Sequence, residues 1–103
     1  MPENEFYYHY KNDPGGAIHN YAYEVMGIGH HTEIKGLDES AMVMYRPLYE
    51  ASVFKAGKHW DLRPLKMFME TVEKNGATMP RFRKIKDPLV VQELTKIRDT
   101  MYL

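Results

Sequence analysis

The longest regular pattern in this sequence is an alternation with a period of two in "YAYEVMGIGH", residues 21–30. In an extended strand, successive side chains point to opposite faces, so Tyr23 and Val25 share one face and Ala22 and Glu24 the other. The glycines at positions 27 and 29 interrupt the side-chain pattern, which predicts a bend where a small barrel turns a corner. This stretch therefore favours a curved sheet as the framework of the fold.

Four further segments show strand-like composition. They are "FYYHYK" (6–11), "AMVMYR" (41–46), "HWDLR" (59–63) and "TMPRFRKI" (78–85). The turn-forming cluster "NDPGG" ends the first, and Pro47 cannot donate a hydrogen bond to a neighbouring strand, so regular pairing should stop there. Within the 41–46 segment, Met42, Met44 and Arg46 alternate with Val43 and Tyr45.

The period changes from two to that of a helix at two places. After Pro64 an apolar stripe predicts a short helix over 65–72 that ends at "KNG"; its members are Leu65, Phe68, Met69 and Val72. Asp87 and Pro88 form an N-cap and first-turn pair for a second helix that runs to about residue 102. Its stripe consists of Val90, Leu94, Ile97 and Met101.

Length and composition restrict the class of protein. A chain of 103 residues has room for one domain, and 14 basic against 14 acidic side chains give no net charge to attract nucleic acid. The sequence contains no cysteine, which fits a reducing compartment, and no apolar run long enough to cross a membrane. We expect a cytoplasmic protein without a membrane partner. A nucleic-acid partner stays open but is not favoured by the net charge.

The order of five segments resembles a known family. "YHYK", "YEVMGIGHHTE", "MVMYRPLYE", "HWDLRPLKMFMETVE" and "PRFRKI" follow one another as in the bacterial and phage proteins of the domain of unknown function 1653 family. The resemblance covers roughly residues 7–86. It implies an SH3-like barrel and supplies no activity, since the family has none established. Three loops are longer than is usual for the family, "NDPGGAIHN", "IKGLDES" and "ASVFKAGK", and a helix is added after residue 85.

Together these observations predict a mainly β (α+β) fold. We expect a small SH3-like barrel of about five strands with one inserted short helix and a C-terminal helix. Residues 1–103 form a single domain in this prediction, with the barrel core at 7–86 and the C-terminal helix at 87–103.

"HHTE" at 30–33 invites a metal site, but neighbouring histidines on a strand face opposite sides and cannot both bind one ion. We therefore predict no metal and no cofactor. His31 and Glu33, two residues apart, could share a face and perform acid–base chemistry, bind a polar edge of a ligand, or form a plain surface pair. The chain lacks nucleophile and phosphate-loop motifs, so whether it is an enzyme stays open, with a non-catalytic role favoured.

The tripeptide Arg-Pro-Leu occurs twice, at 46–48 and 63–65, each time at the end of a strand and beside aromatic residues. Guanidinium groups bind carboxylate or phosphate and also stack on aromatic rings. If both arginines face one rim, they form a ligand site with their neighbours; the predicted residues are Tyr45, Arg46, Tyr49, Trp60 and Arg63. The alternative is that Tyr45 and Trp60 belong to the core and the arginines cover them.

Three function classes follow. The first is a non-catalytic binding module for a small anionic, nucleotide-like ligand, with sequestration of that ligand as one form, or for a short piece of nucleic acid. The second is a protein interaction or assembly module, including a homo-oligomer, in which Met42 and Met44 meet a partner. The third and weakest is a hydrolase that uses His31 and Glu33.

Overall fold

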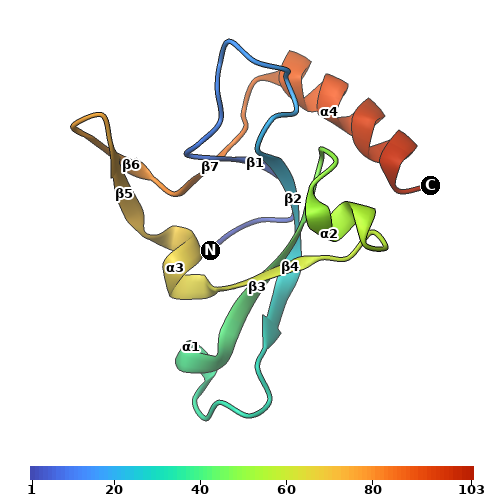
Figure 1. Cartoon of the computed structure of the whole chain (residues 1–103). Coiled ribbons are helices and arrows are strands. Elements are labelled where there is room, and N and C mark those ends of the chain that lie inside the picture. Colours follow the sequence, from blue (N-terminus) through green and yellow to red (C-terminus); the bar gives the residue numbers. More distant parts are fainter.

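The fold is built on one antiparallel sheet. In the computed structural model, which describes residues 1–103, the chain forms β1 (Phe6–His9), β2 (Ala22–His30), α1 (Leu37–Ser40), β3 (Ala41–Pro47), α2 (Ser52–Lys55), β4 (Asp61–Pro64), α3 (Leu65–Met69), β5 (Thr71–Lys74), β6 (Ala77–Pro80), β7 (Phe82–Lys84) and α4 (Pro88–Met101). Five strands form the sheet in the order β4-β3-β2-β1-β7, and β5 and β6 form a separate two-stranded hairpin. Figure 1 shows this hairpin on the side of the molecule opposite α4.

The sheet has two buried faces. One carries seven packed residues, which we call the aromatic core: Tyr7, Tyr23, Val25, Val43, Tyr45, Phe68 and Phe82. The other, the helix-side core, consists of Phe6, Tyr8, Ala22, Leu48, Ile85 and Leu94. Because β1 alternates between them, all four of its residues are buried. The short helix α3 contributes to the first core and α4 covers the second.

The glycine-rich end of β2 bends as its sequence predicts. The pairing of β2 with β3 shifts register between Val25 and Gly27, the signature of a β-bulge. Gly27 has a φ of 152°, which residues with a Cβ rarely adopt. The bulge bends the strand, so the far end of β2 and β3 leads away from the rest of the sheet towards α1 (Figure 1).

The segment after Pro64 differs from the prediction of a helix over 65–72. Helix α3 ends at Met69, and the chain then forms the β5–β6 hairpin. Asn75 and Gly76 occupy its two-residue turn with φ angles of 53° and 78°, the left-handed geometry that an Asn-Gly pair favours. The single final strand predicted over 78–85 is likewise wrong, because Pro80 ends β6 and β7 begins at Phe82.

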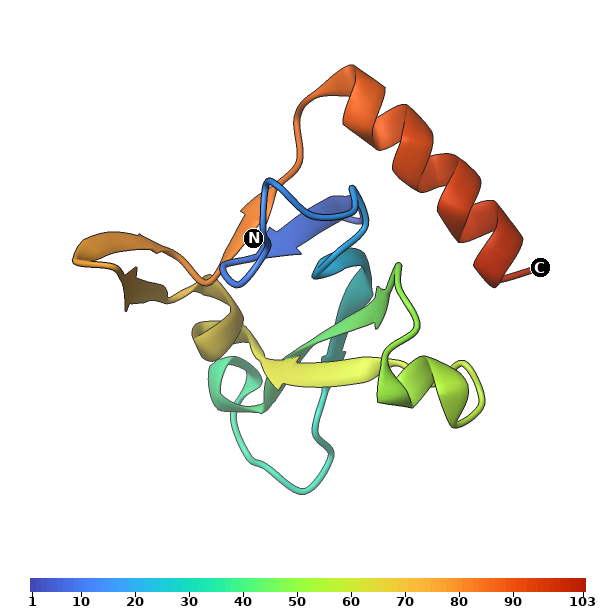
Figure 2. The same ribbon diagram turned by 45° about the horizontal axis from the view of Figure 1, so that its top comes forward.

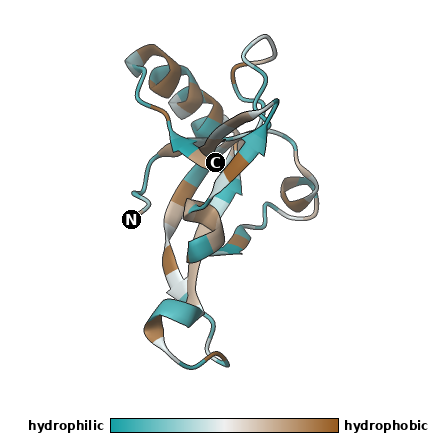
Figure 3. Ribbon diagram, turned by 90° about the vertical axis from the view of Figure 1, so that its left-hand side faces the viewer, coloured by the Kyte–Doolittle hydropathy of each residue, from teal (hydrophilic) through white to brown (hydrophobic).

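The C-terminal helix is confirmed. Asp87 caps α4 by accepting a hydrogen bond from the backbone N–H of Leu89, and Pro88 begins the first turn. Leu94 is fully buried, and the helix shows polar and apolar residues side by side in Figure 3. No helix in the structure combines the length and the apolar character that crossing a bilayer would require.

The mainly β class, the inserted short helix and the C-terminal helix are therefore all present. The five-stranded sheet is open rather than closed into a barrel, because its edge strands β4 and β7 pair with no other strand. Figure 2 shows α4 along one side of the sheet and α3 at the C-terminal end of β4. The structure thus has the predicted class with an open edge on each side.

Candidate functional site

Arg46 belongs to the helix-side face of the sheet. Its Nε donates to Glu24 Oε1 at 2.9 Å, and a terminal nitrogen lies 2.8 Å from the same oxygen. Arg98 of α4 donates to Glu24 Oε2 at 2.9 Å, and the Arg46 guanidinium lies 3.9 Å from the ring centre of Tyr102. We call these four residues the arginine–glutamate cluster. It ties α4 to the sheet and leaves Arg46 little capacity for a ligand.

Arg63 belongs to the opposite face. Its Nε donates to the Tyr45 hydroxyl at 3.1 Å, and its guanidinium lies 5.4 Å from the ring centre of Phe82. The pairing of Tyr45 with Asp61 puts Arg63 on the side of Val43, whereas Arg46 alternates away from Tyr45. The prediction that Arg46 and Arg63 share one rim is therefore wrong, because the sheet separates them.

A tyrosine network accompanies Arg63. The hydroxyls of Tyr23 and Tyr49 lie 2.5 Å apart, and the rings of Tyr23 and Tyr45 meet edge to face at 5.2 Å. Burial raises the pKa of Tyr23, Tyr45 and Tyr49, so all three stay neutral. Burial also raises the pKa of the Asp61 carboxyl, while Arg63 opposes that change. Tyr45 and Tyr49 thus join Arg63 as predicted, but as packing and hydrogen-bonding partners.

The other predicted site residues lie apart. Trp60 is 46% exposed just before β4, and His31 and Glu33 lie in the exposed connection between β2 and α1. The ring Nδ1 of His31 accepts a hydrogen bond from the backbone N–H of Glu33 at 3.2 Å, so their link is a local turn. His31 lines a cavity of about 150 Å³ beside Met42 and Leu62. No cavity is lined by Tyr45, Arg46, Tyr49, Trp60, Arg63 or Glu33.

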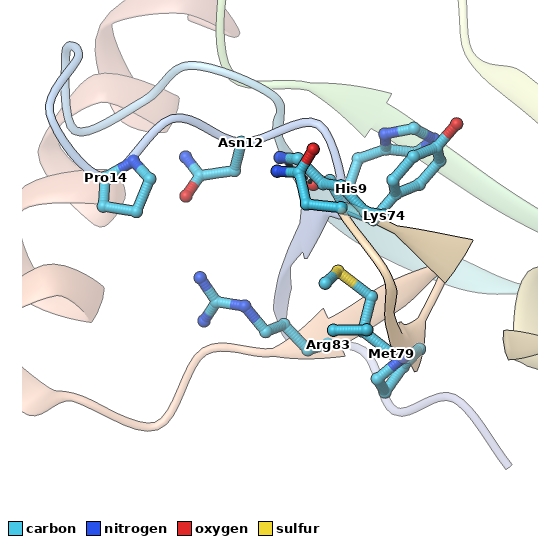
Figure 4. A pocket seen from close by; sticks show the side chains of 10 residues that line it. His9, Asn12, Pro14, Lys74, Met79 and Arg83 are labelled. Atoms are coloured by element: carbon cyan, nitrogen blue, oxygen red, sulfur yellow. Dashed lines mark hydrogen bonds between the residues drawn. The ribbon is translucent and has the colours of Figure 1, made fainter. Parts of the chain in front are cut away.

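The largest cavity lies elsewhere, between the end of β1 and the β5–β6 hairpin. It has a volume of about 480 Å³, within the range typical of small-molecule sites. We call it the hairpin pocket; it is lined by His9, Tyr10, Asn12, Pro14, Lys74, Asn75, Ala77, Met79, Pro80 and Arg83. Figure 4 shows Asn12 and Pro14 on one side of the opening, with Arg83 and Met79 facing them.

The hairpin pocket is electropositive. Its lining contains Lys74 and Arg83 and no carboxylate. Lys74 Nζ donates to the Tyr10 carbonyl at 3.0 Å, which holds the ammonium at the rim. Arg83 takes part in none of the seven ion pairs of the structure and lies 5.0 Å from the ring centre of Tyr8. Two cations that lack an acidic partner here make the pocket locally positive in a chain of zero net charge.

The pKa of His9, which also lines the pocket, is lowered by burial and by nearby cations. Burial lowers the pKa of its imidazole to about 4, helped by the cations Arg63, Lys11, Arg81 and Lys74. The ring Nδ1 accepts a hydrogen bond from the backbone N–H of Lys11 at 3.2 Å. The ring itself packs against Tyr10 at 4.5 Å between ring centres. At neutral pH, His9 is therefore an uncharged, buried aromatic ring.

The prediction from sequence missed most of this pocket. Arg83 falls in the basic segment "RFRKIK" (81–86), but Lys74 stood at the end of a predicted helix. The available signal was Asn75-Gly76 between "TVEK" and "ATMP", which is the strongest short-range indication of a hairpin. A hairpin predicted from that turn would have paired Lys74 with Ala77. In the structure, Lys74 reaches the end of β1 through its bond to the Tyr10 carbonyl.

A family model described as protein of unknown function (DUF1653) matches residues 5–84. The chain belongs to this family. Every residue of the hairpin pocket falls inside the matched segment, whereas α4, which begins at Pro88, lies beyond it. The family assignment confirms the resemblance seen in the sequence, and it carries no activity with it.

A crystal structure of a family member from Bordetella bronchiseptica is similar to this chain. It shares 28% sequence identity and superposes with a TM-score of 0.59, over 81% of this chain and 86% of the other. The comparison with curated proteins finds no match. The function therefore has to be argued from the site.

Proposed function

We propose that this protein is a non-catalytic binding module for a small anionic, nucleotide-like ligand held in the hairpin pocket. The observation that carries this proposal is the composition of the pocket. Two cations without a carboxylate partner, Lys74 and Arg83, line the same 480 Å³ cavity as the aromatic rings of His9 and Tyr10. An anionic group and a flat ring are the two features of a ligand that such a lining would favour.

Each part of the pocket has a distinct role in this proposal. Arg83 offers a planar fork of donors to a phosphate, and Lys74 adds a point charge at the rim. The ring of Tyr10 supplies a face on which a ligand ring can stack, because every nucleobase has such a face, while the buried His9 ring backs it at 4.5 Å between ring centres. The Asn12 carboxamide can both donate and accept hydrogen bonds with the edge of that ring, although its Nδ2 already donates to the Asn20 carbonyl at 2.8 Å.

The lining favours binding over catalysis. It contains no serine, threonine, cysteine, aspartate or glutamate. Of its titratable groups, Lys74 is held by a hydrogen bond to the Tyr10 carbonyl, and the lowered pKa of His9 makes it a weak base. Retention of an anion, including its sequestration, suits these residues better than turnover.

Two of the site residues predicted from sequence, Arg63 and Tyr45, act on the hairpin pocket indirectly. Arg63 contributes through its electrostatic effect on His9, because it is the first of the four cations that lower the pKa of that ring. Tyr45 positions Arg63 through its hydroxyl. Arg46 is bound to Glu24 and is not among the residues that line the pocket.

The proposal is tested by titrating the protein with a panel of nucleoside mono-, di- and triphosphates in a calorimeter. Replacing Arg83 with Gln should weaken binding by about 1.5–3 kcal/mol, the scale of a hydrogen bond to a charged group. Lys74→Gln should have a similar or smaller effect while keeping a donor for the Tyr10 carbonyl. Lys66→Gln, on exposed α3 and outside the pocket, is the matched control and should bind as the wild type does.

A second readout comes from His9. An anion bound beside Lys74 and Arg83 should raise the pKa of the His9 imidazole above about 4, because it offsets the surrounding cations. NMR titration of the ring with and without a bound nucleotide measures this. A panel that shows no binding, or binding that survives both pocket substitutions, contradicts the proposal.

The methionine side of the sheet supports an alternative, assembly with a second copy or another protein. Leu62 is 60% exposed on edge strand β4 and pairs in register with Met44, on the same face as Met42. These three side chains line the small cavity that also contains His31. Light scattering of the wild type and of Leu62→Asp distinguishes the two functions: a mass that falls on substitution supports assembly through this face.

A further inference from the structure

A second cavity adjoins the hairpin pocket. It has a volume of about 300 Å³ and lies between the β1–β2 loop, β7 and the start of α4. We call it the loop pocket; it is lined by Tyr8, Asn12, Asp13, Pro14, Gly16, Ala17, Ile18, Arg83 and Val90. Three residues, Asn12, Pro14 and Arg83, line both cavities, so the two meet along a common wall.

Arg83 lies at the junction. Figure 4 shows its side chain extending away from Met79 into the open space beside Asn12 and Pro14. The guanidinium has no acidic partner, and its nearest aromatic neighbour is the ring of Tyr8, which belongs to the loop pocket. A single cation that lines two adjacent cavities is suited to an anionic group that joins two parts of one ligand.

The two cavities differ in charge. The hairpin pocket adds the cation Lys74, whereas the loop pocket adds the carboxylate of Asp13. One oxygen of that carboxylate accepts a hydrogen bond from the backbone N–H of Gly15 at 2.9 Å. The rest of the loop pocket is largely apolar, with Ile18 and Val90 among its walls. A second anionic group would be repelled there, while an uncharged group with hydroxyls would find an acceptor.

We infer that the two cavities are halves of one site, and that its ligand is a small phosphodiester that links two ring-bearing halves, a dinucleoside monophosphate in chemical class. The phosphodiester lies at Arg83, one base stacks in the hairpin pocket, and the second nucleoside occupies the loop pocket with its hydroxyls towards Asp13. This inference rests on the proposed function, since it assigns the anion to the same Arg83. It adds that a mononucleotide fills only half of the site.

The test compares a nucleoside monophosphate, a dinucleoside monophosphate and a single-stranded hexanucleotide by calorimetry. The dinucleoside monophosphate should bind at least about tenfold more tightly than the mononucleotide, the scale of one further stacked base. Equal affinity for the two overturns the inference and leaves the proposed function standing. No binding of either overturns both. A hexanucleotide that binds about tenfold more tightly again would mean that a strand passes through the site, which overturns a small two-part ligand.

Two matched substitutions locate the halves. Ala17→Trp fills the loop pocket and Ala77→Trp fills the hairpin pocket; both alanines are exposed and outside the cores. Ala17→Trp should leave mononucleotide affinity unchanged and reduce the affinity for the dinucleoside monophosphate to the same level. Ala77→Trp should weaken both ligands. Loss of neither ligand's affinity in Ala17→Trp, with its melting temperature unchanged, would place the second half of the ligand elsewhere.

Discussion

The two faces of the sheet are closed by different means. The aromatic core lies within the segment that matches the family and is completed by the short helix α3, whose Phe68 stacks on Phe82 at 4.1 Å between ring centres. The helix-side core is completed by α4, which lies beyond the matched segment. The matched segment thus contains one complete face, and the other face is covered by a helix outside that segment.

The same contrast separates the two Arg-Pro-Leu copies. Arg46 faces the added helix and is held by the carboxylate of Glu24 and the ring of Tyr102. Arg63 faces the aromatic core and has a single hydroxyl partner, Tyr45. The tripeptide is the same, but the face of the sheet determines whether its arginine fixes a helix in place or covers a set of rings.

The largest expected effects come from breaking each core in turn. Phe68→Ala should lower the free energy of unfolding by about 3–5 kcal/mol and Leu94→Ala by about 2–5 kcal/mol, since both remove buried side chains. Chemical denaturation followed by circular dichroism and by tyrosine fluorescence measures both values. If the faces unfold together, the two probes coincide in each variant. A separate loss of helix signal in Leu94→Ala would show that α4 undocks alone.

Substitution of Arg46 and of Arg63 compares the two faces of the sheet directly. Arg46→Ala should cost about 1.5–3 kcal/mol of stability, because it removes hydrogen bonds to the charged Glu24. Arg63→Ala removes one bond to a phenol and should cost about 0.5–1.5 kcal/mol. Denaturation of both variants under one condition tests the order. A larger loss for Arg63 than for Arg46 would contradict the assignment of the two arginines to different faces.

The stability of the aromatic side should depend on pH through His9. The unfolded chain protonates this ring near pH 6.5 and the folded protein near pH 4, so the unfolded state holds more protons between these values. Stability is therefore lost as the pH falls from 6.5 towards 4, by about 2 kcal/mol at pH 5. Melting temperatures of the wild type and His9→Gln across this range should diverge. Parallel curves would mean that another group governs the slope.

The smallest effect is expected at Trp60, just before the edge strand β4. Trp60→Ser should change the stability of the isolated chain by less than about 0.5 kcal/mol, since the side chain is 46% exposed and belongs to neither core. The melting temperature, read at two protein concentrations, checks this. A clear loss that grows with protein concentration would show instead that Trp60 is buried against a partner.

Much of the fold could be predicted because local patterns determine it. The alternation of residues 21–30 predicted β2, its two glycines predicted the bend, and Asp87 with Pro88 predicted the start of α4. The hairpin was missed because the apolar spacing of Leu65, Phe68 and Val72 fits a helix as well as a helix followed by a strand. A turn that needs two left-handed residues, Asn75 and Gly76, decides between them.

The candidate site was less accessible to prediction. Which face Arg63 occupies depends on the register between β3 and β4, and a shift of one residue would move it to the other side. The hairpin pocket likewise joins residues 9–14 to residues 74–83, and only the assembled sheet brings these segments together. Periodicity along one strand carries no information about its neighbour's register.

The position of β7 has a consequence for how the chain folds. β7 pairs with β1, so Tyr7 lies beside Lys84 although most of the chain separates the two partners in sequence. The β1–β2 pair is local and can form early in synthesis, but one edge of the aromatic segment "FYYH" stays unpaired until the last strand emerges. Unpaired edges of this composition are prone to associate with other chains. We therefore expect β7 to end this exposure during synthesis, and α4, which follows it in the sequence, to dock after it.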